Sequence, residues 1–211
     1  MVEVIVLFSG YSIQIDDVTM KANCSCVLIR ASKLIIVDTM TAWDREKLIE
    51  ALARENVRAA DIDYVVSTHS HADHIGNNNL FLNAEHIVGT CVHRGDTFYE
   101  DKFKDDEYNL CFGVKVIKTP GHTSDDVTVL VDTSLTGKVT CFAITGDLFE
   151  KEEDIYQPDV WKDLGAPELQ KTQSQMRSHI INMADFIIPG HGPIFSVTDE
   201  MRKAVNGQVI S

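Results

Sequence analysis

The chain has 211 residues, a hydrophobic fraction of 44% and a formal net charge of −13 at pH 7. The length suits one domain over residues 1–211, the composition is that of a soluble globular protein, and no apolar run approaches the ~20 residues of a membrane helix. The negative charge weighs against tight binding of long polyanions, because nucleic-acid binders usually present a basic surface.

The first half of the chain alternates strand-like and helix-like stretches. The short, acid-containing segment Glu3–Phe8 has no basic region before it, which predicts a strand and not a secretory signal. Thr41–Glu55 has apolar residues at helical spacing, with Thr41 as the expected N-cap. The other expected elements of this half are strands at Cys24–Arg30, Lys33–Asp38, Asp63–Ser67 and Glu85–Gly89, a hairpin turn at Ala31-Ser32, and a helix near Asn77–Leu82.

The polar segment Arg94–Asp106 precedes the second half and predicts a surface loop. The expected elements that follow are strands at Val114–Lys118, Val127–Asp132, Val139–Thr145 and Asp185–Ile188, a turn at Thr136-Gly137, and helices at Pro167–Met183 and Asp199–Val205. Two groups of strands, each with a helix after it, predict an α/β fold in which two mixed sheets pack face to face with helices outside, the αββα sandwich.

The five cysteines are odd in number and scattered, which predicts a reducing compartment and no disulfide framework. Cys24 and Cys26 stand two residues apart in a strand-like stretch, so their side chains share one face. We expect two small buried residues at these positions, with metal chelation by the pair as the alternative.

Three imidazoles and a carboxylate stand within six residues directly after the predicted strand Asp63–Ser67. The segment reads Thr68-His69-Ser70-His71-Ala72-Asp73-His74. Such side chains rarely become buried without partners. On a tight loop that enters a helix, His69 and His71 point to one place and Asp73 and His74 to an adjacent one, so the spacing predicts two neighbouring metal sites.

Three further donors follow other predicted strands, and each comes directly after a glycine, which lets the chain turn sharply beside a ligand. These donors are His122, Asp147 and His191. Imidazole nitrogen and carboxylate oxygen suit zinc, and a bridging carboxylate suits two close cations. Two such ions, ~3.5–4 Å apart, can share a hydroxide formed at neutral pH. The residues therefore predict a hydrolytic metal centre.

The whole donor set, in this order along the chain, resembles the metallo-β-lactamase superfamily, and the resemblance covers essentially all 211 residues. It implies one metal on His69, His71 and His122. It implies a second metal on Asp73, His74 and His191, with Asp147 as the bridge. It also implies two Zn²⁺ ions per chain, with iron or manganese as alternatives.

Two positions differ from particular branches of the superfamily and so narrow the choice among its activities. Asp147 stands where true zinc β-lactamases commonly have a cysteine, which argues against antibiotic hydrolysis. His71 stands where flavodiiron proteins usually have a glutamate, which favours zinc over di-iron. The flanking sequences are similar to a small branch of the superfamily near glyoxalase II, in the stretches Thr119–Thr123 with Asp126–Val129, Gly146–Glu150, Glu152–Asp154 running on to Trp161, and Ile188–Phe195.

Three residues receive more specific expectations. Asp73 is the candidate catalytic residue, because a carboxylate that touches a metal can also take the proton of the nucleophile. Asp38 ends a predicted strand, and we consider two roles for it: a hydrogen-bond acceptor that supports a metal-bound histidine, as the resemblance suggests, or an ordinary turn carboxylate. Arg177 is expected on a solvated helix face, with contact to an anionic substrate as the alternative.

The expected activity is attack by a metal-bridging hydroxide on a phosphorus or a carbonyl carbon. The branch resemblance implies a phosphodiester hydrolase, namely an endoribonuclease acting on RNA. The alternative is a glyoxalase II-like thioester hydrolase with a small-molecule substrate, and a remote alternative is a metal-binding protein without turnover. A basic groove beside the metals would favour RNA, and a closed neutral pocket a thioester. We further expect a cytoplasmic and also nuclear location, a homodimer and no membrane partner.

Overall fold

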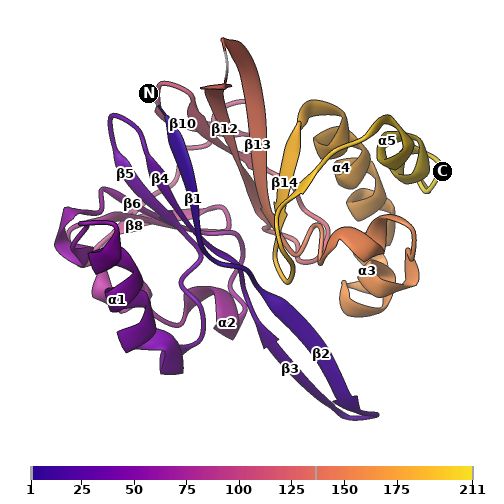
Figure 1. Ribbon diagram of the computed structural model, residues 1–211, viewed down its shortest axis with the longest axis horizontal. Helices are drawn as coiled ribbons and strands as arrows, with labels where there is room; N and C mark the ends of the chain where they lie inside the picture. Colours follow the sequence, from indigo (N-terminus) through magenta and orange to yellow (C-terminus); the bar gives the residue numbers. More distant parts are fainter. Residues whose placement is uncertain (1, 136, 211) are drawn as a thin grey trace.

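The computed structural model describes residues 2–135 and 137–210, which form two large sheets and a separate two-stranded hairpin (Figure 1). The seven-stranded sheet has the order β1-β4-β5-β6-β7-β8-β9, and its strands are β1 (Glu3–Phe8), β4 (Cys26–Arg30), β5 (Leu34–Val37), β6 (Tyr64–Ser67), β7 (Glu85–Val88), β8 (Cys91–Arg94) and β9 (Thr97–Tyr99). The six-stranded sheet runs from β10 to β15, with strands β10 (Glu107–Cys111), β11 (Val114–Lys118), β12 (Val127–Leu135), β13 (Lys138–Gly146), β14 (Phe186–Pro189) and β15 (Phe195–Ser196).

Helices cover the outer faces of the two sheets, except α2 (Ala72–Ile75), which lies at the end of the sheets beside β3 (Thr19–Asn23) (Figure 1). Next to the first sheet is α1 (Arg45–Arg54), and next to the second are α3 (Asp159–Leu164), α4 (Gln170–Met183) and α5 (Asp199–Asn206). Short 3-10 turns are η1 (Ala42–Asp44), η2 (Ala59–Asp61), η3 (Asn78–Leu80), η4 (Glu152–Ile155) and η5 (Pro167–Leu169). None of the helices in the described residues is long and apolar enough to cross a membrane.

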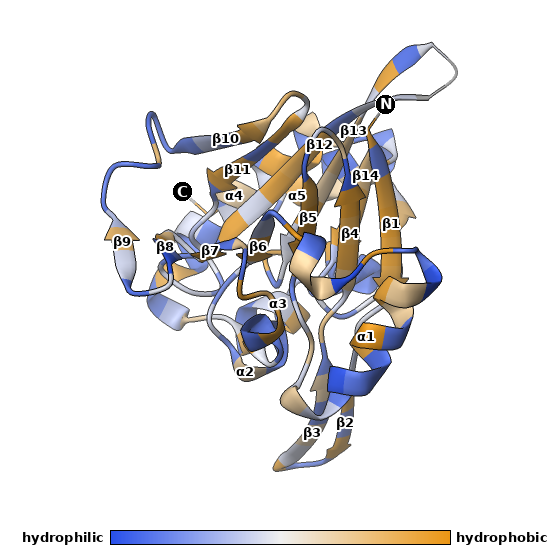
Figure 2. Ribbon diagram, turned by 90° about the vertical axis from the view of Figure 1, so that its left-hand side faces the viewer, coloured by the Kyte–Doolittle hydropathy of each residue, from blue (hydrophilic) through white to orange (hydrophobic). Residues whose placement is uncertain are grey.

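Along the central strands, successive side chains point to opposite faces of the sheet and pack in different core clusters. In β4, Val27 and Ile29 join the cluster between the two sheets, whereas Cys26 and Leu28 join the cluster beneath α1. Because both faces of the sheet are covered, residues 26–29 of β4 are all apolar, and the hydropathy colouring shows β4 orange along most of its length (Figure 2). A third cluster packs the second sheet against α4 and α5. This layering confirms the predicted αββα sandwich.

Several predicted elements differ from the structure. The helix near Asn77–Leu82 is a single 3-10 turn, η3, and the α-helical turn comes earlier, at α2. The predicted loop Arg94–Asp106 contains β9, which extends the first sheet by pairing with β8. Thr41 precedes η1 without a side-chain cap, because its hydroxyl lies 2.5 Å from Asp44 Oδ2 instead. Of the predicted turn at Thr136-Gly137, Thr136 lies outside the described residues.

A β-hairpin that is not among the elements expected above projects from the sandwich (Figure 1). Its strands are β2 (Tyr11–Asp16) and β3 (Thr19–Asn23). Opposed pairs such as Ser12 with Ala22 share the face that turns toward the donor residues. This hairpin therefore forms one wall of the site described next.

Candidate metal centre

The histidine-rich segment leaves the end of β6 and enters α2. Asp38 organises this turn: its carboxylate accepts hydrogen bonds from the Thr68 N–H at 2.7 Å and the Thr68 hydroxyl at 2.9 Å. His71 is the N-cap residue of α2, and Asp73 and His74 lie within that helix. The segment therefore presents two pairs of donors from one short, braced turn.

The other donors reach the same place from the second sheet. His122 follows β11, Asp147 follows β13 and His191 follows β14. β13 and β14 are parallel, and their register pairs Gly146 with Pro189, which brings Asp147 and His191 together. A side chain at position 190 would displace Asp147, because a Cβ on Gly190 would lie 1.9 Å from Asp147 Oδ1. The glycines therefore make room for the donors.

The first donor group contains three imidazole nitrogens. His71 Nδ1 lies 2.9 Å from His69 Nε2 and 3.1 Å from His122 Nε2. Asp147 Oδ2 lies 3.6 Å from His69 Nε2 and 3.5 Å from His122 Nε2. Nitrogens bound tetrahedrally to one zinc ion at ~2.0–2.1 Å are about 3.3 Å apart, so these four atoms match the edges of one coordination sphere.

The second donor group lies on the other side of Asp147. His74 Nε2 is 3.9 Å from Asp73 Oδ2 and 3.3 Å from Asp147 Oδ1. His191 Nε2 is 3.8 Å from Asp73 Oδ2 and 3.2 Å from Asp147 Oδ2. Asp147 is therefore in contact with both groups, and the structure brings all seven predicted donors together in two adjoining clusters able to bind metal.

Hydrogen bonds orient two of the second group's ring nitrogens toward this site. His74 Nδ1 lies 2.9 Å from Asp38 Oδ2, and His191 Nδ1 donates to the carbonyl of Asn23 at 3.0 Å. With Nδ1 protonated, Nε2 of each ring carries the free lone pair that a metal requires. Of the two roles considered for Asp38, the structure shows the supporting acceptor.

Buried polar atoms without partners show that the site fits cations. Among the described residues, Asp73 Oδ2, His74 Nε2 and Asp147 Oδ1 are buried and make no hydrogen bond. Each such atom would cost about 1–3 kcal/mol if nothing satisfied it. Burial opposes ionisation of Asp147, but the surrounding His74, His191 and His69 hold its pKa well below the usual range. Two divalent ions would satisfy these atoms together.

Glu150 is a further acidic residue at the site, and it is one that the sequence patterns did not single out. It is 2% exposed and lies near two of the site's five histidines, His122 and His191. Burial, and then the charge of Asp147, raise the pKa of Glu150 well above its usual range. Its position three residues after Asp147, on the same loop, was the signal available in the sequence.

Arg177 corrects an expectation, because it is 1% exposed and not on a solvated helix face. Its guanidinium donates to both carboxylate oxygens of Asp154, at 2.6 and 3.0 Å, and to the Leu148 carbonyl at 2.7 Å. It also stacks over the Phe149 ring, 4.1 Å from the centroid. Arg177 therefore braces the loop that carries Asp147 and Glu150, and contact with an anionic substrate would require breaking this ion pair.

Cys24 and Cys26 are 1% and 0% exposed and are free thiols. Both pack in the apolar cluster beneath α1, as expected for small buried residues. Cys24 also lies near Asp38 and His74. Burial, and then the negative charge of Asp38, raise the pKa of both thiols well above the usual range, which opposes the thiolate form that metals bind.

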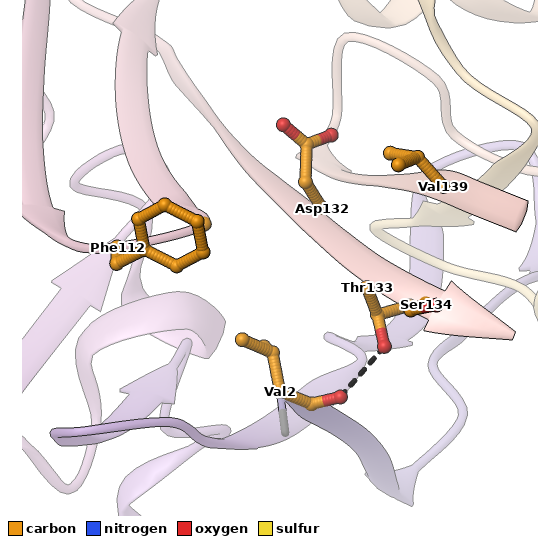
Figure 3. A pocket seen from close by; sticks show the side chains of 7 residues that line it. Val2, Phe112, Asp132, Thr133, Ser134 and Val139 are labelled. Carbon is orange, nitrogen blue, oxygen red and sulfur yellow. Dashed lines mark hydrogen bonds between the residues drawn. The ribbon is translucent and has the colours of Figure 1, made fainter. Parts of the chain in front are cut away.

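The donors open onto a pocket of about 170 Å³. Its walls include Ser12, Met20 and Ala22 from the hairpin and Leu164 from α3. A second cavity, of about 430 Å³, lies at the end of β12 and shares no lining residue with the first (Figure 3). Asp132 is the one acidic residue among its described lining residues, which include no histidine, so this second cavity lacks the donor set of the first.

The geometry predicts the metal content of the purified protein. Because seven donors form two groups and Asp147 contacts both, saturation with zinc should give close to two ions per chain. Removing the ions should lower the melting temperature by mass action, since they join loops from both sheets. Elemental analysis and thermal unfolding measure the two effects. A firm stoichiometry of one ion at saturation would contradict the two-group arrangement.

Comparisons with known proteins agree with the fold. The family model described as "Metallo-beta-lactamase superfamily" matches residues 21–191. The chain is 38% identical over 195 residues to metallo-beta-lactamase domain-containing protein 1 of Xenopus laevis, covering 91% of this chain and 80% of the frog protein. It is 37% identical over 169 residues to the Homo sapiens protein of that name, covering 79% of this chain and 60% of the human one.

Among solved structures, a quorum-quenching N-acyl homoserine lactone lactonase superposes with a TM-score of 0.64 at 20% identity, covering 90% of each chain. That likeness shows the fold. Together with the family match across the donor residues, these comparisons assign the chain: it belongs to the metallo-β-lactamase superfamily of metal-dependent hydrolases, and it is similar to metallo-beta-lactamase domain-containing protein 1.

Proposed function

We propose that this chain is a dinuclear zinc hydrolase, and that its substrate is a small acyl compound such as a thioester or an ester. The observation that carries the metal assignment is the pair of donor groups joined by Asp147. Five of the seven donors are imidazoles, which favours zinc over the oxygen-preferring cations. Two zinc ions would supply a nucleophilic hydroxide at neutral pH and polarise the substrate oxygen.

Asp147 and Asp73 have different roles in the proposed reaction. Asp147 is 5% exposed and faces both donor groups, so it sets their spacing. Asp73 is 21% exposed and lines the pocket, which leaves it in reach of the reacting atoms. A carboxylate in this position can accept the proton of the nucleophile and return it to the leaving group. We therefore assign Asp73 as the proton shuttle.

The pocket favours an acyl substrate over RNA. Among the described residues that line it there is no lysine or arginine, whereas Asp73, Asp147 and Glu150 are acidic. The two zinc ions would hold the reacting group, but the RNA phosphates on each side of it need further positive charge, and no basic side chain among the described lining residues provides it. Met20, Ala22 and Leu164 offer apolar surface to an acyl chain instead.

RNA phosphodiester hydrolysis is the second candidate. Its support is the similarity to the branch that contains metallo-beta-lactamase domain-containing protein 1. The metal arrangement suits phosphorus as well as carbon, since both reactions place negative charge on an oxygen between two cations. The lack of basic side chains among the described pocket residues and the net charge of −13 count against it.

A parallel assay of the zinc-loaded protein tests the proposal. The panel contains an acyl thioester, an aryl ester, a β-lactam and a single-stranded RNA, each with and without a chelator. We expect chelator-sensitive hydrolysis of the thioester or ester and little cleavage of the RNA. Chelator-sensitive cleavage of RNA alone would replace the acyl proposal with the second candidate. Absence of turnover on the whole panel, with two metals bound, would favour a protein without hydrolytic activity.

A further inference from the structure

Glu150 occupies a position that the loop holds firmly. Its backbone N–H donates to Asp154 Oδ2 at 2.8 Å, and its carbonyl accepts from the His191 N–H at 2.8 Å. Asp154 is in turn held by the buried guanidinium of Arg177. These two backbone hydrogen bonds fix the position of residue 150. The Glu150 carboxylate, which is 2% exposed, therefore stays beside the donor groups.

His122 has a ring nitrogen that needs a partner. Its Nε2 faces the first donor group, 3.1 Å from His71 Nδ1, so metal binding through Nε2 leaves the hydrogen on Nδ1. Within the described part of the chain, Nδ1 is buried and makes no hydrogen bond. Glu150 Oε1 lies 3.7 Å from this nitrogen. A small movement of either side chain would bring the two atoms to hydrogen-bond distance.

The other Nε2-facing histidines of the site already have their second nitrogen engaged. His74 Nδ1 contacts Asp38, and His191 Nδ1 donates to a backbone carbonyl. His69 Nδ1 lies 3.2 Å from the Thr68 hydroxyl. Of these four histidines, His122 is the one whose Nδ1 makes no hydrogen bond within the described part of the chain. The side chain beside this nitrogen is the buried carboxylate of Glu150.

We propose that Glu150 is the positioning residue of the first metal site: it accepts the Nδ1–H of His122 when His122 Nε2 binds the metal. The inference rests on the proposed metal centre and assigns to Glu150 a role outside the seven donors. A carboxylate acceptor fixes the tautomer and the ring orientation of a metal-bound histidine and makes it a stronger donor.

Metal affinity tests the proposal without relying on turnover. In zinc and cobalt titrations, Glu150→Ala should weaken one of the two binding events by ~10–100-fold, the usual effect of losing such an acceptor. Glu150→Gln keeps a neutral acceptor oxygen and should lose less. Glu153→Ala is the matched control, because Glu153 is an exposed carboxylate on the same loop. Equal affinities of Glu150→Ala and the control would overturn the proposal.

Two further measurements separate a positioning role of Glu150 from direct binding of a metal by its carboxylate. In NMR spectra of the zinc-loaded protein, the His122 Nδ1–H signal should exchange slowly in wild type and quickly in Glu150→Ala. In a His122→Ala background, Glu150→Ala should not change the affinity of the metal that remains. A further loss there would identify Glu150 as a direct ligand of the second ion and overturn the proposal.

The wild-type titration distinguishes this inference from the proposed function. If wild type binds fewer than two metals, the dinuclear centre itself fails. If wild type binds two metals and only the Glu150 effect is missing, the centre stands and the positioning role falls. Should Glu150→Ala not fold, as judged by thermal unfolding of the metal-free protein, the Gln variant carries the same comparison through its His122 Nδ1–H exchange rate.

Discussion

Turnover is expected to fall by ~10²–10⁴-fold in Asp73→Asn, the usual contribution of general acid–base catalysis. Asparagine keeps the size of the side chain and one oxygen that can contact the second metal, but it cannot accept the proton of the nucleophile. The rate constant for turnover and the metal content per chain are measured together at saturating zinc, with the substrate that the assay panel identifies.

His71→Ala provides the comparison for Asp73→Asn. It removes a nitrogen of the first donor group, 2.9 Å from His69 Nε2, so metal content should fall much more than in the asparagine variant. If Asp73→Asn binds two metals and turns over at a nearly normal rate, Asp73 is a ligand without a role in proton transfer. Activity lost strictly in proportion to lost metal would lead to the same conclusion.

Arg177→Met should lower the free energy of unfolding by ~3–5 kcal/mol, because removal of one partner leaves the other charge buried and uncompensated. Arg177 and Asp154 have side chains that are 1% and 0% exposed, so solvent does not replace the lost contacts. Denaturant unfolding monitored by circular dichroism gives the value. The same variant should weaken metal binding, since Arg177 also holds the Leu148 carbonyl beside Asp147.

Arg58→Met is the matched control for this prediction. Arg58 also forms a bidentate pair, with Asp61, but its side chain is 82% exposed. Such surface pairs contribute little to stability, so this variant should unfold nearly as wild type does. Equal stabilities of the two methionine variants would mean that the Arg177–Asp154 pair does not hold the loop. Partial recovery in a double variant with Asp154→Leu would attribute the loss to the unpaired carboxylate.

Local patterns in the sequence were sufficient for the sandwich and for the metal donors. The central strands are apolar on both faces, as in residues 26–29, because each face meets a separate core cluster. The donors His69 to His74 come directly after β6, and the glycine-preceded donors come after strands, so their residue types and spacing appear in the linear sequence. Residue types and spacings within a short segment can be recognised without knowing which distant segments come into contact.

The environment of the metal donors depends on tertiary contacts between segments that are distant in the sequence. Arg177 and Asp154 stand 23 residues apart and belong to ordinary polar stretches, so nothing local marks them as a buried pair. Tyr11, Ile13 and Ile15 alternate with polar residues in β2, which is a strand pattern, but only the tertiary structure places this hairpin at the wall of the pocket. Hydrogen bonds of the Glu150 backbone with Asp154 and His191 determine the position of Glu150. A charged side chain becomes buried only where partners from other segments compensate it, and folding brings those segments together.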